Sequence, residues 1–149
     1  MQIIIVGCGN VGTTLTEQLS KEGHNITVVD MDAKKAESVA NRFDVMGIVG
    51  NGASFTVQNE AGIEAADLMI AVTTSDELNL LCCLIARKAG GCNTIARVRN
   101  PIYNKEITYI KEELGLSMVI NPEYAAASEI ARLLKFPSAI KVDSFAKGR

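Results

Sequence analysis

Three glycines and one aspartate near the amino terminus have the spacing that suits the phosphates and ribose of a nucleotide. Gly7, Gly9 and Gly12 form a Gly-x-Gly-x-x-Gly pattern, and Asp30 ends the next apolar segment. Glycines allow a sharp turn and the close approach of a pyrophosphate, and a helix that starts there offers free N–H groups. A strand–helix turn without a ligand is the alternative, but such a turn does not require the distant acid. The pattern therefore favours a dinucleotide-binding fold.

Alternating strand-like and helix-like segments must position these residues. Strands are expected at 1–6, 26–30, 45–49, 67–72, 94–98 and 117–120, and helices at 11–21, 33–43, 54–61, 75–90 and 104–114. This alternation is typical of α/β proteins, and it predicts a doubly wound, parallel, six-stranded Rossmann sheet with the strand order 3-2-1-4-5-6. In the fourth of these helices we expect a buried stripe made of Leu80, Leu81, Leu84 and Ile85.

The last part of the chain departs from this alternation. An alanine-rich helix is expected at 122–136, and an extended segment at 139–142 follows Pro137. We expect residues 1–134 to form the Rossmann domain with its C-terminal helical extension. Residues 135–149 are then a linker or the start of a missing C-terminal region. Because the chain stops just after a new strand-like segment, we expect it to be a fragment of a longer protein.

Composition argues against several classes of partner. The net charge is −2 and no block of Lys and Arg is present, so nucleic-acid binding is disfavoured. No apolar run approaches the roughly 20 residues of a membrane span, and Met1 leads straight into a strand without the features of a secretory signal. A cytoplasmic location is therefore expected.

The cysteines favour structural thiols over a metal site. Cys82 and Cys83 are adjacent, and no pair in the chain has the Cys-x-x-Cys spacing of a zinc site. Cys8 lies at a predicted helix N-terminus, where a thiolate is favoured. A small side chain that fills the loop is the preferred interpretation of Cys8. No metal site is expected.

The carboxyl ends of parallel strands share one edge of the sheet, where ligands bind. Four segments and one arginine converge at that edge. Arg97 can meet a ligand phosphate there or pair with a protein carboxylate, and the sequence leaves both interpretations open. The candidate binding residues are Gly7, Cys8, Gly9, Asn10, Val11, Gly12, Asp30, Met31, Asn51, Gly52, Thr73, Thr74 and Arg97.

Asp30 restricts the class of ligand. Its charge repels a 2′-phosphate, so NAD is favoured over NADP. ATP, ADP and AMP carry the same free ribose hydroxyls as NAD, and Asp30 does not separate them from it.

The groups needed for hydride-transfer catalysis are missing. The single histidine, His24, precedes the second strand, at the edge of the sheet opposite the candidate site. None of Tyr103, Tyr109 and Tyr124 has a lysine four residues further on. We therefore expect no catalytic residues and no enzyme activity.

Five stretches carry a resemblance that covers essentially the whole chain: Ile3–Gly12, Ile26–Asp30, Val49–Gly52, Ala71–Asn79 and Ile95–Pro101. The chain resembles the N-terminal nucleotide-binding domain of TrkA-type potassium-uptake regulators, also called the KTN or RCK N-terminal domain. The third and fourth stretches are much more specific than the glycine loop alone.

The resemblance implies a regulatory subunit, peripheral to the inner face of the cell membrane, that gates a TrkH-type potassium transporter subunit. NAD(H) is the expected ligand, and ATP or ADP is the alternative. It also implies a homodimer or a higher ring, with the 122–136 helix as one candidate interface. By position, the resemblance implies that the glycine loop holds the phosphates and that Asp30 holds the ribose. Asn51 and Gly52 would flank the adenine, and Thr73 and Thr74 would lie along the cofactor. Arg97 would reach the phosphates or a neighbouring subunit.

Two features depart from the family pattern. Many relatives have arginine or glutamine where this chain has Asn10, which leaves the choice between NAD and ATP open. The usual C-terminal regulatory domain is absent from this sequence. The alternative function is the cofactor-binding half of an NAD-dependent oxidoreductase, and a third is a nucleotide-stabilised oligomerisation module.

Overall fold

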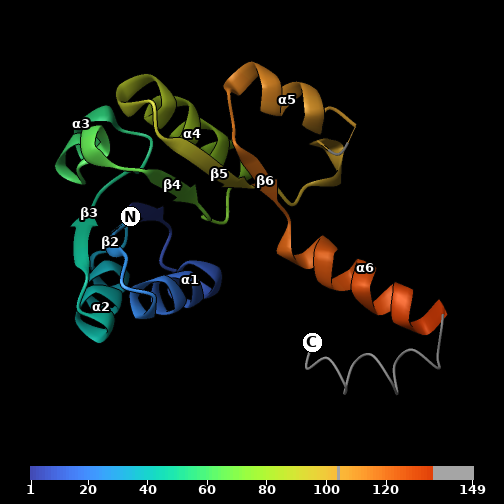
Figure 1. The fold of residues 1–149 in the computed structure, drawn as a ribbon, viewed down its shortest axis with the longest axis horizontal. Coiled ribbons are helices and arrows are strands. Elements are labelled where there is room, and N and C mark those ends of the chain that lie inside the picture. Colours follow the sequence, from blue (N-terminus) through green and yellow to red (C-terminus); the bar gives the residue numbers. More distant parts are fainter. Residues whose placement is uncertain (104, 136–149) are drawn as a thin grey trace.

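A computed structural model describes residues 1–103 and 105–135, and its centre is a six-stranded parallel sheet (Figure 1). The strand order β3-β2-β1-β4-β5-β6 confirms the predicted Rossmann topology. In register, Ile5 of β1 lies beside Val28 of β2 and Ile70 of β4. The strands are β1 Gln2–Val6, β2 Asn25–Asp30, β3 Met46–Val49, β4 Leu68–Ala71, β5 Asn93–Arg97 and β6 Met118–Ile120.

Helices cover both faces of the sheet (Figure 1). α1 and α2 lie on one face and α3, α4 and α5 on the other, while α6 extends away from the sheet at the end of the described chain. None of the helices in the described ranges is long and apolar enough to span a membrane. The helices are α1 Asn10–Lys21, α2 Ala33–Phe43, α3 Phe55–Glu60, α4 Asp76–Gly90, α5 Ile107–Leu114 and α6 Pro122–Lys135, with 3₁₀ turns at Ile63–Ala65 and Pro101–Tyr103.

The core has two apolar layers because successive residues of each strand point to opposite faces. Ile3 and Ile5 of β1 belong to the layer under α1 and α2. Ile4 and Val6 belong to the layer under α3 and α4. The central strands are therefore buried on both sides, which explains why they are continuous apolar runs in the sequence.

Two predictions about the helices were wrong in detail. Leu81 of α4 is 46% exposed, and the face that packs on the sheet instead carries Asn79, Cys82, Cys83 and Ala86. Small side chains let this helix lie close to the strands, so the bulky leucines stand at its flanks. The helix expected at 104–114 begins only at Ile107. A 3₁₀ turn at Pro101–Tyr103 precedes it, and the Asn100 side chain accepts a hydrogen bond from the Ile102 N–H there. The extended segment expected at 139–142 lies outside the described residues.

Gly7 lies in the loop that joins β1 to α1, and Gly12 lies in the first turn of α1, where the two pack against each other. Gly7 adopts a φ of +109°, which side chains disfavour, and a Cβ there would also lie 2.9 Å from the carbonyl carbon of Val72. A Cβ on Gly12 would overlap the carbonyl oxygen of Gly7. By contrast, a Cβ on Gly9 would meet no atom within 4 Å. The first and last glycines are thus required by packing, and the middle one borders open space.

This contrast predicts different costs for two Gly→Ala substitutions. Gly12→Ala should lower the free energy of unfolding by about 3 kcal/mol or more, because the obstacle is a backbone carbonyl that cannot move aside. Gly9→Ala should cost about 1 kcal/mol, the ordinary penalty for alanine at a helix N-cap. Urea denaturation followed by circular dichroism measures both, and equal losses of stability in the two variants would contradict the packing described above.

Candidate functional site

The main candidate site is a cavity of about 370 Å³ at the carboxyl edge of the sheet. It lies where the strand order reverses between β1 and β4, the position at which open α/β sheets bind ligands. Most of the residues predicted from the sequence line it: Gly7, Gly9, Asn10, Val11, Asp30, Met31, Gly52, Thr73, Thr74 and Arg97.

Asp30 is held in place by two backbone groups at the end of β2. Its Oδ2 accepts a hydrogen bond from the Cys8 N–H and its Oδ1 accepts one from the Asp32 N–H, both at 2.8 Å. Each carboxylate oxygen retains further acceptor capacity. The carboxylate therefore faces the cavity in a fixed orientation and can accept hydrogen bonds from ribose hydroxyls.

The N-terminus of α1 supplies the complementary donors. Gly9 is its N-cap, and no side chain caps the helix there. Gly9, Asn10 and Val11 all line the cavity, and no side chain of the loop fills the space above Gly9. Free N–H groups and the positive end of the helix dipole are well suited to bind phosphate at this position.

Three predicted residues lie behind the cavity wall instead of lining it. Gly12 packs against the Gly7 carbonyl, and Asn51 uses its side-chain oxygen to accept a hydrogen bond from the Ala53 N–H. The side chain of Cys8 is buried beside α2, whereas its N–H supports Asp30. These residues shape the loops, and Lys35, Ser75 and Leu78, which the sequence prediction did not include, line the cavity.

Cys8 is a neutral thiol despite its position at a helix N-terminus. Burial, followed by the negative charge of Asp30, raises its pKa to about 12, and the positive charge of Lys35 only partly opposes this. Burial also raises the pKa of Cys82 to about 12 and raises that of Cys83 and Cys92. These environments fit the structural role expected for the thiols. In the described part of the chain, no group of three His, Cys, Asp or Glu side chains could hold a metal ion.

Asn79 fixes the opposite wall of the cavity, and sequence reasoning did not single it out as a site residue. Its fully buried side-chain oxygen accepts hydrogen bonds from the N–H and the hydroxyl of Thr73, at 2.8 and 2.6 Å. Its amide donates to the carbonyls of Thr73 and Arg97, at 3.1 and 2.9 Å. One side chain thus joins the ends of β4 and β5. A polar residue among the apolar positions of a helix is the sequence signal that could have indicated Asn79.

Gln58 supports the loop that contains Gly52. The Gln58 side chain is 1% exposed, and its amide donates to the carbonyls of Gly52 and Cys82 at 2.8 and 3.0 Å. Gly52 itself has no room for a side chain, because a Cβ there would collide with Val6. The loop after β3 is therefore held against the cavity from behind.

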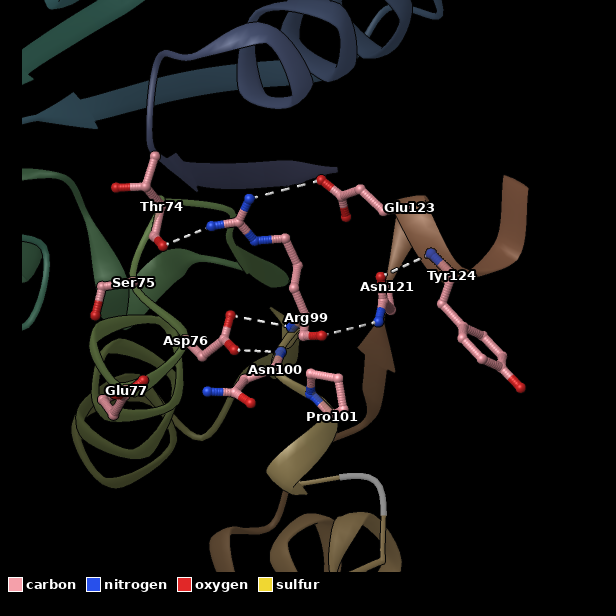
Figure 2. Close-up of a pocket in the computed structure, with 10 residues that line it drawn as sticks. All are labelled: Thr74, Ser75, Asp76, Glu77, Arg99, Asn100, Pro101, Asn121, Glu123 and Tyr124. Atoms are coloured by element: carbon pink, nitrogen blue, oxygen red, sulfur yellow. Dashed lines mark hydrogen bonds and ion pairs between the residues drawn. The ribbon is translucent and has the colours of Figure 1, made fainter. Parts of the chain in front are cut away.

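A second hollow of about 600 Å³ adjoins the first, and Thr74 and Ser75 line both (Figure 2). Asp76 closes its floor by accepting hydrogen bonds from the N–H groups of Arg99 and Asn100, at 3.0 and 2.7 Å. The Arg99 side chain crosses the hollow and donates to the Thr74 carbonyl at 2.8 Å. This hollow has both acidic and basic walls.

Arg97 lines the first cavity and pairs with Glu123, which lies in the first turn of α6 and lines the second hollow. The structure thus contains the carboxylate pairing that the sequence left as one of two possibilities for Arg97. Arg99 lies on the other side of Glu123, with 3.8 Å between its nitrogen and the same carboxylate oxygen. Burial alone would raise the pKa of Glu123, but hydrogen bonds from Arg97 and the backbone and both arginine charges lower it below its ordinary value.

The chemistry available in the 370 Å³ cavity is that of binding. Its lining offers backbone N–H groups, hydroxyls, one carboxylate and two cationic side chains, Lys35 and Arg97. No histidine, cysteine or tyrosine side chain is among the lining residues. The arrangement can hold a phosphorylated nucleoside, and it presents no paired nucleophile and base.

Comparisons with known proteins agree with this fold. Residues 3–122 match the family model of the TrkA-N domain. The Trk system potassium uptake protein TrkA homolog of Archaeoglobus fulgidus is 40% identical over 149 residues, which are all of this chain and 34% of the relative. TrkA of Haemophilus influenzae is 38% identical over 152 residues, covering all of this chain and 33% of the relative. The chain thus spans about a third of the length of these relatives.

Solved structures show the same architecture. The TrkA-N domain of the inner membrane protein ybaL from Escherichia coli superposes with a TM-score of 0.78 at 25% identity, over 89% of this chain and 96% of that one. The NAD-bound GsuK channel superposes with a TM-score of 0.67 at 23% identity, over 80% of this chain and 21% of that chain. The AMP-bound Kef CTD of Shewanella denitrificans superposes with a TM-score of 0.72 at 18% identity, over 87% of this chain and 77% of that chain. The last two likenesses establish the fold alone.

The four hydrogen bonds of Asn79 predict a large stability loss when its amide is removed. Asn79→Ala should lower the free energy of unfolding by about 3 kcal/mol, since buried backbone groups of Thr73 and Arg97 lose their partner. Asn59→Ala, at an exposed position of α3, should change it by less than about 0.5 kcal/mol. Urea denaturation measures both variants. A loss below 1 kcal/mol for Asn79→Ala would show that this residue does not hold the strand ends.

The buried cysteines predict slow thiol labelling of the native protein. At pH 8 all four thiols should react with a chromogenic disulfide reagent many times more slowly than in urea, because burial keeps them both protonated and inaccessible. The colour yield over time in buffer and in urea measures this. Fast native labelling that disappears in Cys8→Ser would instead show that Cys8 is a reactive thiolate.

Proposed function

The chain belongs to the TrkA-N domain family, and we propose that it is the nucleotide-binding unit of a regulatory subunit of a potassium-uptake system. The observation that carries this proposal is the 370 Å³ cavity, whose lining includes both the uncapped N-terminus of α1 and the fixed Asp30 carboxylate. Relatives across all of this chain are named as Trk system potassium uptake proteins. Together, site and relatives favour a ligand-binding regulatory role.

The proposed ligand is NAD(H), with ATP or ADP as the alternative. Asp30 suits the free ribose hydroxyls that these nucleotides share, and its charge disfavours a 2′-phosphate. The phosphates would lie over residues 9–11, which line the cavity at the uncapped N-terminus of α1. GsuK with NAD or ADP and the Kef CTD with AMP have the same fold, which supports an adenine nucleotide in this place.

The ligand would act by shifting a conformational equilibrium, because a ligand biases gating only if it binds two states with unequal affinity. The proposed target is a membrane potassium transporter subunit of the TrkH type, which the chain would regulate from the cytoplasmic side of the membrane. The lining of the cavity offers ligand-binding groups without catalytic pairs. We therefore propose regulation by binding, not an enzyme activity.

The exposed apolar side chains of α6 support the proposal of a homodimer or a higher ring. Tyr124, Ile130 and Leu134 are each 59% exposed or more, although they lie on one helix of only 14 residues. Exposed apolar groups gathered on one element are typical of protein–protein interfaces. A second copy of the chain would cover them.

Isothermal titration calorimetry with NAD, ADP and AMP tests the proposed ligand class. Asp30→Ala should weaken ADP and NAD binding about tenfold or more, since hydrogen bonds to a charged group contribute about 1.5–3 kcal/mol. Glu37→Gln, which removes an exposed acid of α2, should bind as the wild type does. Circular dichroism should show that both variants are folded. An absence of binding by the wild-type chain would refute the proposed function, and unchanged affinity in Asp30→Ala would refute the ribose contact.

A further inference from the structure

We propose that Glu123 is a built-in competitor for the ligand: its carboxylate occupies the Arg97 guanidinium that a second phosphate of the nucleotide would otherwise use. Glu123 would then set the preference among nucleotides and tie α6 to the occupancy of the cavity. This inference rests on the proposed function, and it concerns two residues that lie on different elements, β5 and α6.

Arg97 keeps an unused hydrogen-bond donor within the described part of the chain. It lines the nucleotide cavity, is 8% exposed, and donates from its terminal nitrogen to Glu123. Its Nε is buried and has no hydrogen-bond partner among the described residues. A guanidinium carries five N–H donors in a planar fork that matches a phosphate as well as a carboxylate. The buried and unpaired Nε therefore shows that the Glu123 carboxylate satisfies the Arg97 guanidinium only in part.

Glu123 is the more exposed partner of this pair. Its side chain is 52% exposed, whereas that of Arg97 is 10% exposed. In Figure 2 the Glu123 carboxylate reaches from the start of α6 toward Arg99, which itself is anchored to the Thr74 carbonyl. Two arginines thus share one carboxylate, and the cluster keeps a net positive charge. An incoming phosphate can replace the carboxylate without leaving either arginine unpaired.

The placement of the other ligand-binding groups selects which phosphate would compete. A ribose at Asp30 and a first phosphate at the N-terminus of α1 occupy the side of the cavity formed by β1 and β2. Arg97 lies across the switch point, at the end of β5. Only a ligand that extends beyond its first phosphate would reach it. Competition should therefore affect ADP and NAD more than AMP, and it should not affect adenosine.

Displacement of Glu123 would act on α6 because Glu123 lies in the first turn of this helix. Asn121 accepts a hydrogen bond from the Tyr124 N–H and contacts the Arg99 carbonyl at 3.5 Å, and Glu123 pairs with the two arginines. From Glu123 to Arg132 the helix is exposed. Leaving the Arg97 charge buried without an anion costs free energy. Exchanging the Glu123 carboxylate for a phosphate therefore has a free-energy change closer to zero than releasing the carboxylate with no replacement. A near-balanced exchange is what a ligand-dependent helix position requires.

Calorimetry with adenosine, AMP and ADP on Glu123→Gln tests the competition. Removing the carboxylate charge should lower the Kd of ADP about three- to tenfold, a modest factor because the carboxylate is half exposed. The Kd of adenosine should stay unchanged. Glu129→Gln, which removes a carboxylate from the same helix away from Arg97, should bind ADP as the wild type does.

A double-mutant cycle separates competition from a general change of charge or fold. In an Arg97→Gln background, Glu123→Gln should change the Kd of ADP by less than twofold. Unchanged or weaker ADP binding in Glu123→Gln, or an equal gain for adenosine, would overturn the inference. If the wild-type chain binds ADP and NAD while Glu123→Gln behaves identically, the competition fails and the proposed function stands.

The position of α6 can be followed by fluorescence because the chain contains no tryptophan. In Tyr124→Trp, ADP should change the emission of the single tryptophan. With Glu123→Gln added, the emission without ADP should already be near the ADP-bound value, and ADP should change it little. An equal ADP response with and without the Glu123 carboxylate would contradict the coupling to α6.

Discussion

The Asp30 carboxylate is the interaction on which the candidate site depends. With one oxygen it fixes the Cys8 N–H of the glycine loop, and with the other it fixes the Asp32 N–H at the start of α2. The segments after β1 and β2 therefore meet on a single charged group. The same group faces the cavity, so the residue that orders the two loops is also the one that can accept the ribose hydroxyls of a nucleotide.

The other half of the cavity depends on polar side chains that reach into the backbone from α4. Asn79 joins the ends of β4 and β5, and Asp76 holds the N–H groups of Arg99 and Asn100 beyond β5. Both side chains are buried, so their loss would leave backbone groups without partners. The cavity is consequently preorganised on both sides before a ligand arrives, which lowers the ordering cost of binding.

The sequence alone was sufficient for the sheet order and for the glycine loop because these depend on local patterns. Apolar runs that alternate with helical segments define a parallel sheet, and Asp30 follows the loop at the expected distance. The buried face of α4 was misassigned because a count of apolar side chains favours leucines over Asn79 and the small cysteines that pack on the strands. The Arg97–Glu123 pair joins residues 26 positions apart. It depends on how α6 leaves the sheet, which no local pattern specifies.

A crystal structure of this chain grown with ADP tests the central claim most directly. We expect adenosine ribose hydroxyls within hydrogen-bond distance of the Asp30 carboxylate and phosphates over the N–H groups of residues 9–11. A nucleotide bound elsewhere on the chain, or one in the cavity whose ribose does not contact Asp30, would contradict it.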